Sequence, residues 1–242
     1  MTDPAFDRPP VPPSVLAPSP VAPPPASTRE AVAALNRTHD MAGLRARGGV
    51  VVRTIEERRR ALVVRRVLRA GGGVVVDVGC EDGWIAVGYA ARVRETVLVD
   101  LDPTMLARAR ARGLPRVRTL EADAAAAGAL PRASVDVVVL SAVLEHVPRP
   151  AAVLEAWAPA LRAGGRFVVF VPADRPILAA KRLLRATGLH RLARGVSLDP
   201  APGHVRVFTR RSLVRLLKPF GVLEEVEFDP AVLGYAATLR VA

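Results

Sequence analysis

Glycines and carboxylates gather where two apolar segments of the chain end, and their types suit the binding of a nucleoside. The segment Val74 to Val78 leads into a turn that contains Gly79 and Gly83. Glycines at such a place let the backbone approach a ligand closely. Asp100 ends the next apolar segment, roughly 20 residues beyond Gly79, as expected for a carboxylate that accepts hydrogen bonds from both ribose hydroxyls. Together the two segments predict a ribose-binding site.

The spacing of the glycines distinguishes this turn from a nicotinamide-binding turn. A G-x-G-x-x-G pattern that starts at Gly79 needs glycine at two later positions, where the chain has Glu81 and Trp84. The segment instead reads Asp77-x-Gly79-x-Glu81-x-Gly83, an acidic residue followed by alternating glycines with one of them replaced. The pattern therefore favours a cofactor other than a nicotinamide dinucleotide.

The elements that must position these groups are predicted to form a parallel sheet covered by helices. Nearly continuous valine-rich segments alternate with helical segments, which is typical of parallel strands buried on both faces. The predicted strands are Val74 to Val78, Thr96 to Asp100, Val117 to Leu120, Val135 to Leu140 and Phe167 to Val171, followed by a hairpin of Val222 to Phe228 and Tyr235 to Val241. The expected fold class is α/β, with a doubly wound, mostly parallel, seven-stranded sheet.

A tail and helices are expected before this sheet. Ten prolines within residues 1–26 favour a disordered, extended tail. Two capping-box spacings predict helix starts within 27–70, namely Ser27 with Glu30 and Thr54 with Glu57. A further helix is expected to begin near Trp84. One domain, 27–242, follows from a chain length that suits a single core.

Four later segments occur in a recognisable order: EADAAA at 121–126, SVDVVVLSAVLEHV at 134–147, LRAGGRFVVFVP at 161–172 and GHVRVFTRRSLVRLL at 203–217. With the glycine turn, they make the chain from about Arg53 onward resemble the class I S-adenosylmethionine-dependent methyltransferases, in the branch that includes quinone-biosynthesis and many natural-product enzymes. The resemblance implies a Rossmann-like fold and S-adenosylmethionine as cofactor. The cofactor-binding residues it implies are Asp77, Gly79, Cys80, Glu81, Gly83, Asp100, Leu101, Asp123, Ala124 and Ser141.

Several of these residues have a second interpretation. Asp123 would accept a hydrogen bond from the adenine amino group, although aspartate also readily begins a helix. Asp77 would line the cofactor site or hydrogen-bond within the turn. Glu81 replaces the glycine that lies near the methionine portion of the cofactor in the family, where a carboxylate would crowd the cofactor or attract its ammonium. Cys80 is expected to pack as a small side chain, because methyl transfer needs no covalent enzyme intermediate.

Glu145 and His146 follow the fourth strand, at the face where an acceptor would meet the methyl group, and are the candidate catalytic residues. An imidazole there could take a proton from a hydroxyl. Some relatives bind a divalent metal here through an E-x-x-E-H cluster, but this chain has Ala142 at the first position. With His204 the set is small for a hard cation. A base, a metal ligand and a structural or substrate-shaping role remain alternatives.

Residues 173–202 lie where the family carries insertions that cover the substrate. The part from Asp174 to Arg194 is basic and amphipathic, so its leucines could face a lipid-like acceptor or a membrane surface while its cationic side chains meet phosphates. A cap helix with a solvated basic face is the alternative. The expected partner is a small-molecule or lipid-like substrate, with peripheral membrane contact through 174–194.

Composition limits the other functional classes. The net charge of +12 comes from arginine, since lysine occurs only at Lys181 and Lys218, and aromatic residues make up 4% of the chain. RNA methylation, which would use aromatic stacking, is therefore a weaker alternative, as is a catalytically silent interaction module. No apolar run reaches the roughly 20 residues of a membrane span. Cys80 is the single cysteine, and no secretory signal precedes the domain, so a cytoplasmic location is expected.

Overall fold

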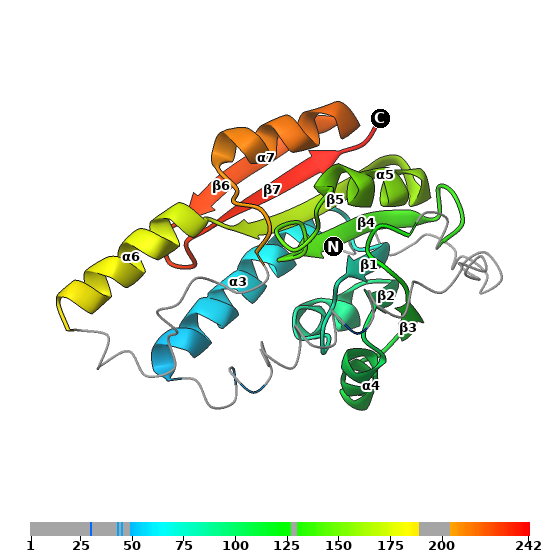
Figure 1. Cartoon of the computed structure of the whole chain (residues 1–242). Coiled ribbons are helices and arrows are strands. Elements are labelled where there is room, and N and C mark those ends of the chain that lie inside the picture. The colour runs from blue at the N-terminus through cyan, green and yellow to red at the C-terminus, as the bar shows by residue number, and fades with distance from the viewer. Residues whose placement is uncertain (1–29, 31–42, 44, 46–48, 127–129, 189–203) are drawn as a thin grey trace, which may run out of the picture.

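A single seven-stranded sheet forms the centre of the protein in the computed structural model, which describes residues 30, 43, 45, 49–126, 130–188 and 204–242 (Figure 1). The strands lie in the order β3-β2-β1-β4-β5-β7-β6. Their bounds are β1 Val74–Val78, β2 Glu95–Asp100, β3 Val117–Glu121, β4 Val135–Ser141, β5 Leu161–Pro172, β6 Val222–Asp229 and β7 Gly234–Arg240. The first five are parallel, and β7 is antiparallel to both β5 and β6. The predicted doubly wound fold, terminal hairpin included, is confirmed.

Helices cover both faces of the sheet, because each central strand is apolar on both sides. Val76 and Val78 of β1 face a core that includes side chains of α5 and α7, whereas Val75 faces a core that includes α3, α4 and the turn after β1. The helices are α3 Val50–Arg69, α4 Pro103–Ala111, α5 Pro150–Trp157, α6 Asp174–Ala186 and α7 Arg210–Leu217. Because all five parallel strands run the same way, their carboxyl ends meet at one edge, where ligands of such folds bind.

Two predicted helix starts differ from the structure. Helix α3 begins at Val50 instead of Thr54, and Thr54 lies inside it with its hydroxyl donating to the Val50 carbonyl at 2.8 Å. The chain after Gly83 forms two short 3₁₀ turns, η3 Ala86–Gly88 and η4 Ala90–Arg92, in place of a helix from Trp84. The tail at 1–26, the helix start at Ser27 and residues 189–202 of the predicted insertion lie outside the described residues.

Helix α6 begins the predicted substrate-covering insertion. It leaves the carboxyl end of β5 and projects away from the sheet, and only its first residue, Asp174, is buried (Figure 1). Among the described helices, none is both long enough and apolar enough to cross a membrane. The fold thus places α6 beside the edge where the predicted site residues lie.

Candidate active site

The glycine turn after β1 has the backbone geometry that its sequence predicts. Gly79 and Gly83 have φ of 68° and 74°, in the left-handed region that favours glycine. The N–H groups of Gly79 and Cys80 both donate to the carbonyl of Val99 in β2, at 2.8 and 3.0 Å. A side chain at Gly83 would press on α4, where a Cβ would lie 3.3 Å from the Cβ of Ala109. The turn therefore depends on both glycines for its shape and its packing.

Replacing Gly79 by alanine is expected to destabilise the protein by about 2–4 kcal/mol, because the left-handed backbone disfavours a side chain and the new Cβ would meet Val143. That Cβ would lie 2.6 Å from Cγ2 of Val143, which is far inside van der Waals contact. Denaturant unfolding of the purified variant measures the loss. Gly113→Ala is the matched control, since Gly113 has φ of 62° and open space around it. An equal loss in both variants would contradict the role of the Val143 contact.

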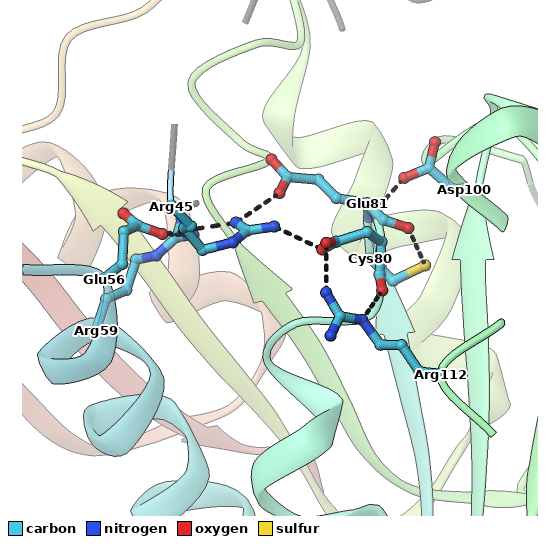
Figure 2. Close-up of polar contacts among 8 residues, drawn as sticks. Arg45, Glu56, Arg59, Cys80, Glu81, Asp100 and Arg112 are labelled. Carbon is cyan, nitrogen blue, oxygen red and sulfur yellow. Dashed lines mark hydrogen bonds and ion pairs between the residues drawn. The ribbon is translucent and has the colours of Figure 1, made fainter. Parts of the chain in front are cut away.

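Glu81 occupies the position of the replaced glycine and keeps the glycine conformation. Its φ is 50°, and its N–H donates to Oδ2 of Asp100 at 2.9 Å. Its carboxylate points toward the guanidinium of Arg45, 3.5 Å away, and its side chain is 37% exposed (Figure 2). The turn thus accommodates a glutamate at this position, with the carboxylate paired to an arginine from the N-terminal segment.

An ion-pair network that the sequence analysis did not foresee surrounds this turn (Figure 2). Arg45 donates to Asp82 at 2.7 Å and lies 3.8 Å from Glu56 of α3. Arg112, at the end of α4, donates to both the carboxylate and the carbonyl of Asp82. Because Asp82 lies 37 residues from Arg45 and 30 residues from Arg112, no local spacing indicates these two pairs. The network ties three elements to the turn.

Arg59 of α3 carries an unpaired buried donor beside this network. Its Nη2 donates to Glu56 at 2.7 Å, but its buried Nε has no hydrogen-bond partner among the described residues. Both Glu81 and Glu145 are close enough to interact with its charge. A buried N–H without a partner is costly, which marks Arg59 as a group available to an anionic ligand.

Asp100 lies at the carboxyl end of β2, against the glycine turn. Its Oδ2 accepts from the N–H of Glu81 and its Oδ1 from the N–H of Asp102, each at 2.9 Å. Burial raises the pKa of this carboxyl to about 6, against the opposing effect of those two N–H groups. Each carboxylate oxygen can accept a further hydrogen bond, so the group can still receive donors from a ligand.

Asp77 is placed deeper than the other carboxylates among the predicted cofactor-binding residues. It lies within β1, is 2% exposed and accepts a hydrogen bond from the hydroxyl of Tyr89 at 2.8 Å. Burial raises the pKa of Asp77 to about 7, although the Tyr89 hydrogen bond lowers it. Cys80 is also buried, and burial raises the pKa of its thiol, which fits the expectation of a packed side chain and not a nucleophile.

The remaining predicted cofactor residues follow β2, β3 and β4 at the same edge. Asp123 accepts from the N–H of Ala125 at 2.7 Å, which forms a turn there. The carbonyl of Ala124 accepts from the indole of Trp157 at 2.8 Å. Leu101 is buried after β2, and Ser141 ends β4 with a buried hydroxyl that has no hydrogen-bond partner among the described residues.

Glu145 and His146 meet His204 beyond the end of β4. One ligand atom from each of the three lies within 4.8 Å of the others. Glu145 is 1% exposed, neither of its carboxylate oxygens has a hydrogen-bond partner among the described residues, and burial raises its pKa to about 8. Ala142 stands with φ of 59° where the relatives' first glutamate would lie. One carboxylate and two imidazoles form a small donor set for a hard cation, so no metal is assigned here.

Comparison with known proteins agrees with this arrangement of turn, sheet edge and carboxylates. Residues 76–169 match the family described as a methyltransferase domain. This central part of the chain therefore has the sequence pattern of a methyltransferase domain. The resemblance to the class I S-adenosylmethionine-dependent methyltransferases is thereby confirmed.

Curated relatives share this central part of the domain. A probable S-adenosylmethionine-dependent methyltransferase of Mycobacterium tuberculosis is 37% identical over 116 residues, covering 48% of this chain and 42% of that protein. A ubiquinone biosynthesis O-methyltransferase of Idiomarina loihiensis is 38% identical over 98 residues, covering 39% of this chain and 40% of that protein. The matched region thus spans about two fifths of the length of these relatives.

Solved structures share the fold of the methyltransferase domain. The N-methyltransferase NodS from Bradyrhizobium japonicum, in complex with S-adenosyl-L-homocysteine, superimposes with a TM-score of 0.57 at 15% identity, covering 77% of this chain and 87% of that chain. A possible exported protein from Bordetella parapertussis gives a TM-score of 0.61 at 20% identity, covering 79% of this chain and 69% of that chain. At these identities the likeness concerns the fold.

Proposed function

We propose that this protein transfers a methyl group from S-adenosylmethionine to a small-molecule or lipid-like acceptor by direct in-line displacement. The observation that carries the proposal is the position of Asp100, whose buried carboxylate ends β2 against the turn at Gly79 to Gly83. Curated relatives with this domain are named as S-adenosylmethionine-dependent methyltransferases, which supports the same cofactor.

The described residues offer suitable groups for each part of that cofactor. Asp100 would accept from the ribose hydroxyls, and Asp123 with the backbone at Ala124 would contact the adenine. The unpaired Nε of Arg59 would donate to the methionine carboxylate, and Glu81 would accept from the ammonium. Asp77 would support the turn from within the sheet through Tyr89. When bound, the cofactor supplies a methyl group on a positively charged sulfur.

The acceptor would lie over the carboxyl edge of the sheet, next to Glu145 and His146. Glu145 is 1% exposed, so water is largely excluded around its carboxyl, and positioning with desolvation would supply most of the rate enhancement. The ubiquinone biosynthesis O-methyltransferases among the relatives favour an acceptor of small-molecule or lipid-like type.

Helix α6 supports peripheral contact with a membrane that would deliver a lipid-like acceptor. Leu183 on this helix is 65% exposed, and Lys181, Arg182 and Arg185 lie within two positions of it in the sequence. We expect the protein to co-sediment with phosphatidylglycerol vesicles but not with phosphatidylcholine vesicles. Leu183→Asp should weaken the binding about tenfold, whereas Val222→Asp, at a residue 57% exposed on β6, should not. Equal binding to both kinds of vesicle would contradict the electrostatic part of this proposal.

Calorimetric titration of the full chain with S-adenosylmethionine and S-adenosylhomocysteine tests the proposed function. Micromolar binding of both, followed by methyl transfer to members of a panel of hydroxylated and lipid-like acceptors, is the expected result. A folded protein that binds neither compound would contradict the proposal and favour an interaction module. Steeply salt-dependent RNA binding would favour an RNA substrate.

A further inference from the structure

Three segments that are distant in the sequence place a histidine and an aspartate together beside the predicted acceptor position. Asp174 begins α6 directly after β5, and His204 precedes α7. The N–H groups of Val205 and Arg206 donate to the carbonyl of Glu145 at 2.9 and 3.2 Å, which fixes the His204 segment against the exit of β4. His204 also packs edge-on against His146, with ring centroids 4.9 Å apart.

The contact between Asp174 and His204 defines which nitrogen of the imidazole carries the proton. Nδ1 of His204 lies 2.8 Å from Oδ1 of Asp174, and a carboxylate oxygen accepts hydrogen bonds. The proton of neutral His204 therefore lies on Nδ1, and Nε2 keeps its lone pair. Asp174 is 7% exposed, and its Oδ2 is buried without a hydrogen-bond partner among the described residues, so this carboxylate is committed to the histidine.

The groups around His204 are less suited than His204 to accept a proton. Burial raises the pKa of Glu145 to about 8, so its carboxyl carries a proton at neutral pH and can donate a hydrogen bond. The other groups that face His204 are Asp174 from α6 and His146 from the β4 exit, and Arg59 of α3 interacts with the charge of Glu145. Of these groups, His204 is the one whose Nδ1 is held by a carboxylate, that of Asp174. Such a hydrogen bond orients an imidazole so that its other nitrogen can act as a base.

We infer that His204 is the general base of the reaction and that Asp174 is its positioning residue, so that the acceptor is a hydroxyl compound. This inference rests on the proposed function. As the acceptor oxygen bonds to the methyl carbon, the methyl–sulfur bond breaks and the hydroxyl proton passes to Nε2 of His204. The positive charge of the sulfonium is replaced by that of the imidazolium, which then releases its proton to solvent. A hydroxyl needs this help because its oxygen is a weak nucleophile while it holds a proton.

Nuclear magnetic resonance tests the geometry without requiring turnover. Long-range proton–nitrogen spectra of the ¹⁵N-labelled full chain report which imidazole nitrogen is protonated, and the His204→Gln variant assigns the signal. The neutral ring of His204 should carry its proton on Nδ1 in the wild type and become a mixture of tautomers in Asp174→Asn. A neutral wild-type ring protonated on Nε2 would overturn the inference.

Kinetics with 4-methylphenol and 4-nitrophenol tests the role in catalysis. The nitro compound has the more acidic hydroxyl and needs a base less. His204→Gln should lower kcat for 4-methylphenol by about 10²-fold or more and for 4-nitrophenol by much less. Asp174→Asn should lower kcat for 4-methylphenol by a smaller factor, because the ring of His204 is then no longer held with its proton on Nδ1. Equal losses with both phenols would overturn the inference.

A matched control and a binding measurement separate this inference from the proposed function. Asp136→Asn removes a carboxylate that is 3% exposed at the amino end of β4, the opposite edge of the sheet, and should leave kcat for both phenols unchanged. All variants should bind S-adenosylhomocysteine within about twofold of the wild type. Wild-type protein that binds this compound but methylates neither phenol would overturn the hydroxyl acceptor and leave the cofactor proposal standing. Wild-type protein that does not bind it would contradict both.

Discussion

Replacing Asp100 by alanine is expected to abolish measurable binding of S-adenosylmethionine and S-adenosylhomocysteine. The change removes the acceptor for the ribose hydroxyls and also the acceptor for the N–H groups of Glu81 and Asp102. Hydrogen bonds to a charged group contribute about 1.5–3 kcal/mol each, so the affinity should fall by roughly 10²-fold or more. Calorimetric titration measures the loss.

Asp229→Ala is the matched control for this prediction. Asp229 is 1% exposed and accepts from the N–H of Ala231 at 2.8 Å, two residues along the chain, as Asp100 does from Asp102. It ends β6, the outermost strand on the side of the sheet opposite to β3 and β2. The control should retain wild-type affinity. Affinity in the wild type should also decline below about pH 6, because protonation of Asp100 removes the charge that accepts the hydroxyls. Unchanged affinity of Asp100→Ala would exclude this carboxylate from the cofactor site.

Replacing Glu145 by glutamine is expected to make the stability of the protein less dependent on pH. Burial raises the pKa of Glu145 to about 8 in the folded state, whereas the unfolded chain has an ordinary glutamate. The folded state therefore binds more protons than the unfolded state between about pH 4 and pH 8, and this group lowers the free energy of unfolding as the pH rises through that range. The contribution is on the order of 3 kcal/mol.

Denaturant unfolding at about pH 5.5 and about pH 8.5 measures this effect, because the folded-state pKa of Glu145 lies between these two values. The wild type should lose more stability than Glu145→Gln between the two conditions. Glu155→Gln on α5 is the control, because Glu155 is exposed and should keep the wild-type pH dependence. If Glu145→Gln and the wild type lose the same stability, the carboxyl of Glu145 is ionised in the folded protein.

The sheet and the cofactor edge could be predicted from the sequence because both leave local patterns. Valine-rich strands such as Val135 to Leu140 stand out as buried on both faces, and the structure extends that strand only to Ser141. The glycine turn and Asp100 are separated by one crossover, so their proximity follows from the parallel sheet alone. The positive φ values of Gly79 and Gly83 confirm the reason for glycine there.

Other parts of the site depend on contacts between distant segments. Arg45 and Arg112 approach Asp82 from separate helical regions, and 30 residues separate His204 from Asp174. Arginines are so frequent in this chain that no single one stands out as a partner. The start of α3 was misplaced because a threonine inside a helix can donate to the preceding turn, as Thr54 does, and so imitates a capping residue.

The position of β7 has a consequence for how the fold assembles. β6 pairs only with β7, so the hairpin of β6 and β7 joins the rest of the sheet through the pairing of β7 with β5 alone. That pairing joins segments that α6 and α7 separate in the chain. Such long-range pairing is slow and is completed late. The carboxyl edge that holds Asp100 can thus be organised by β1, β2 and β4 before the far side of the sheet is closed.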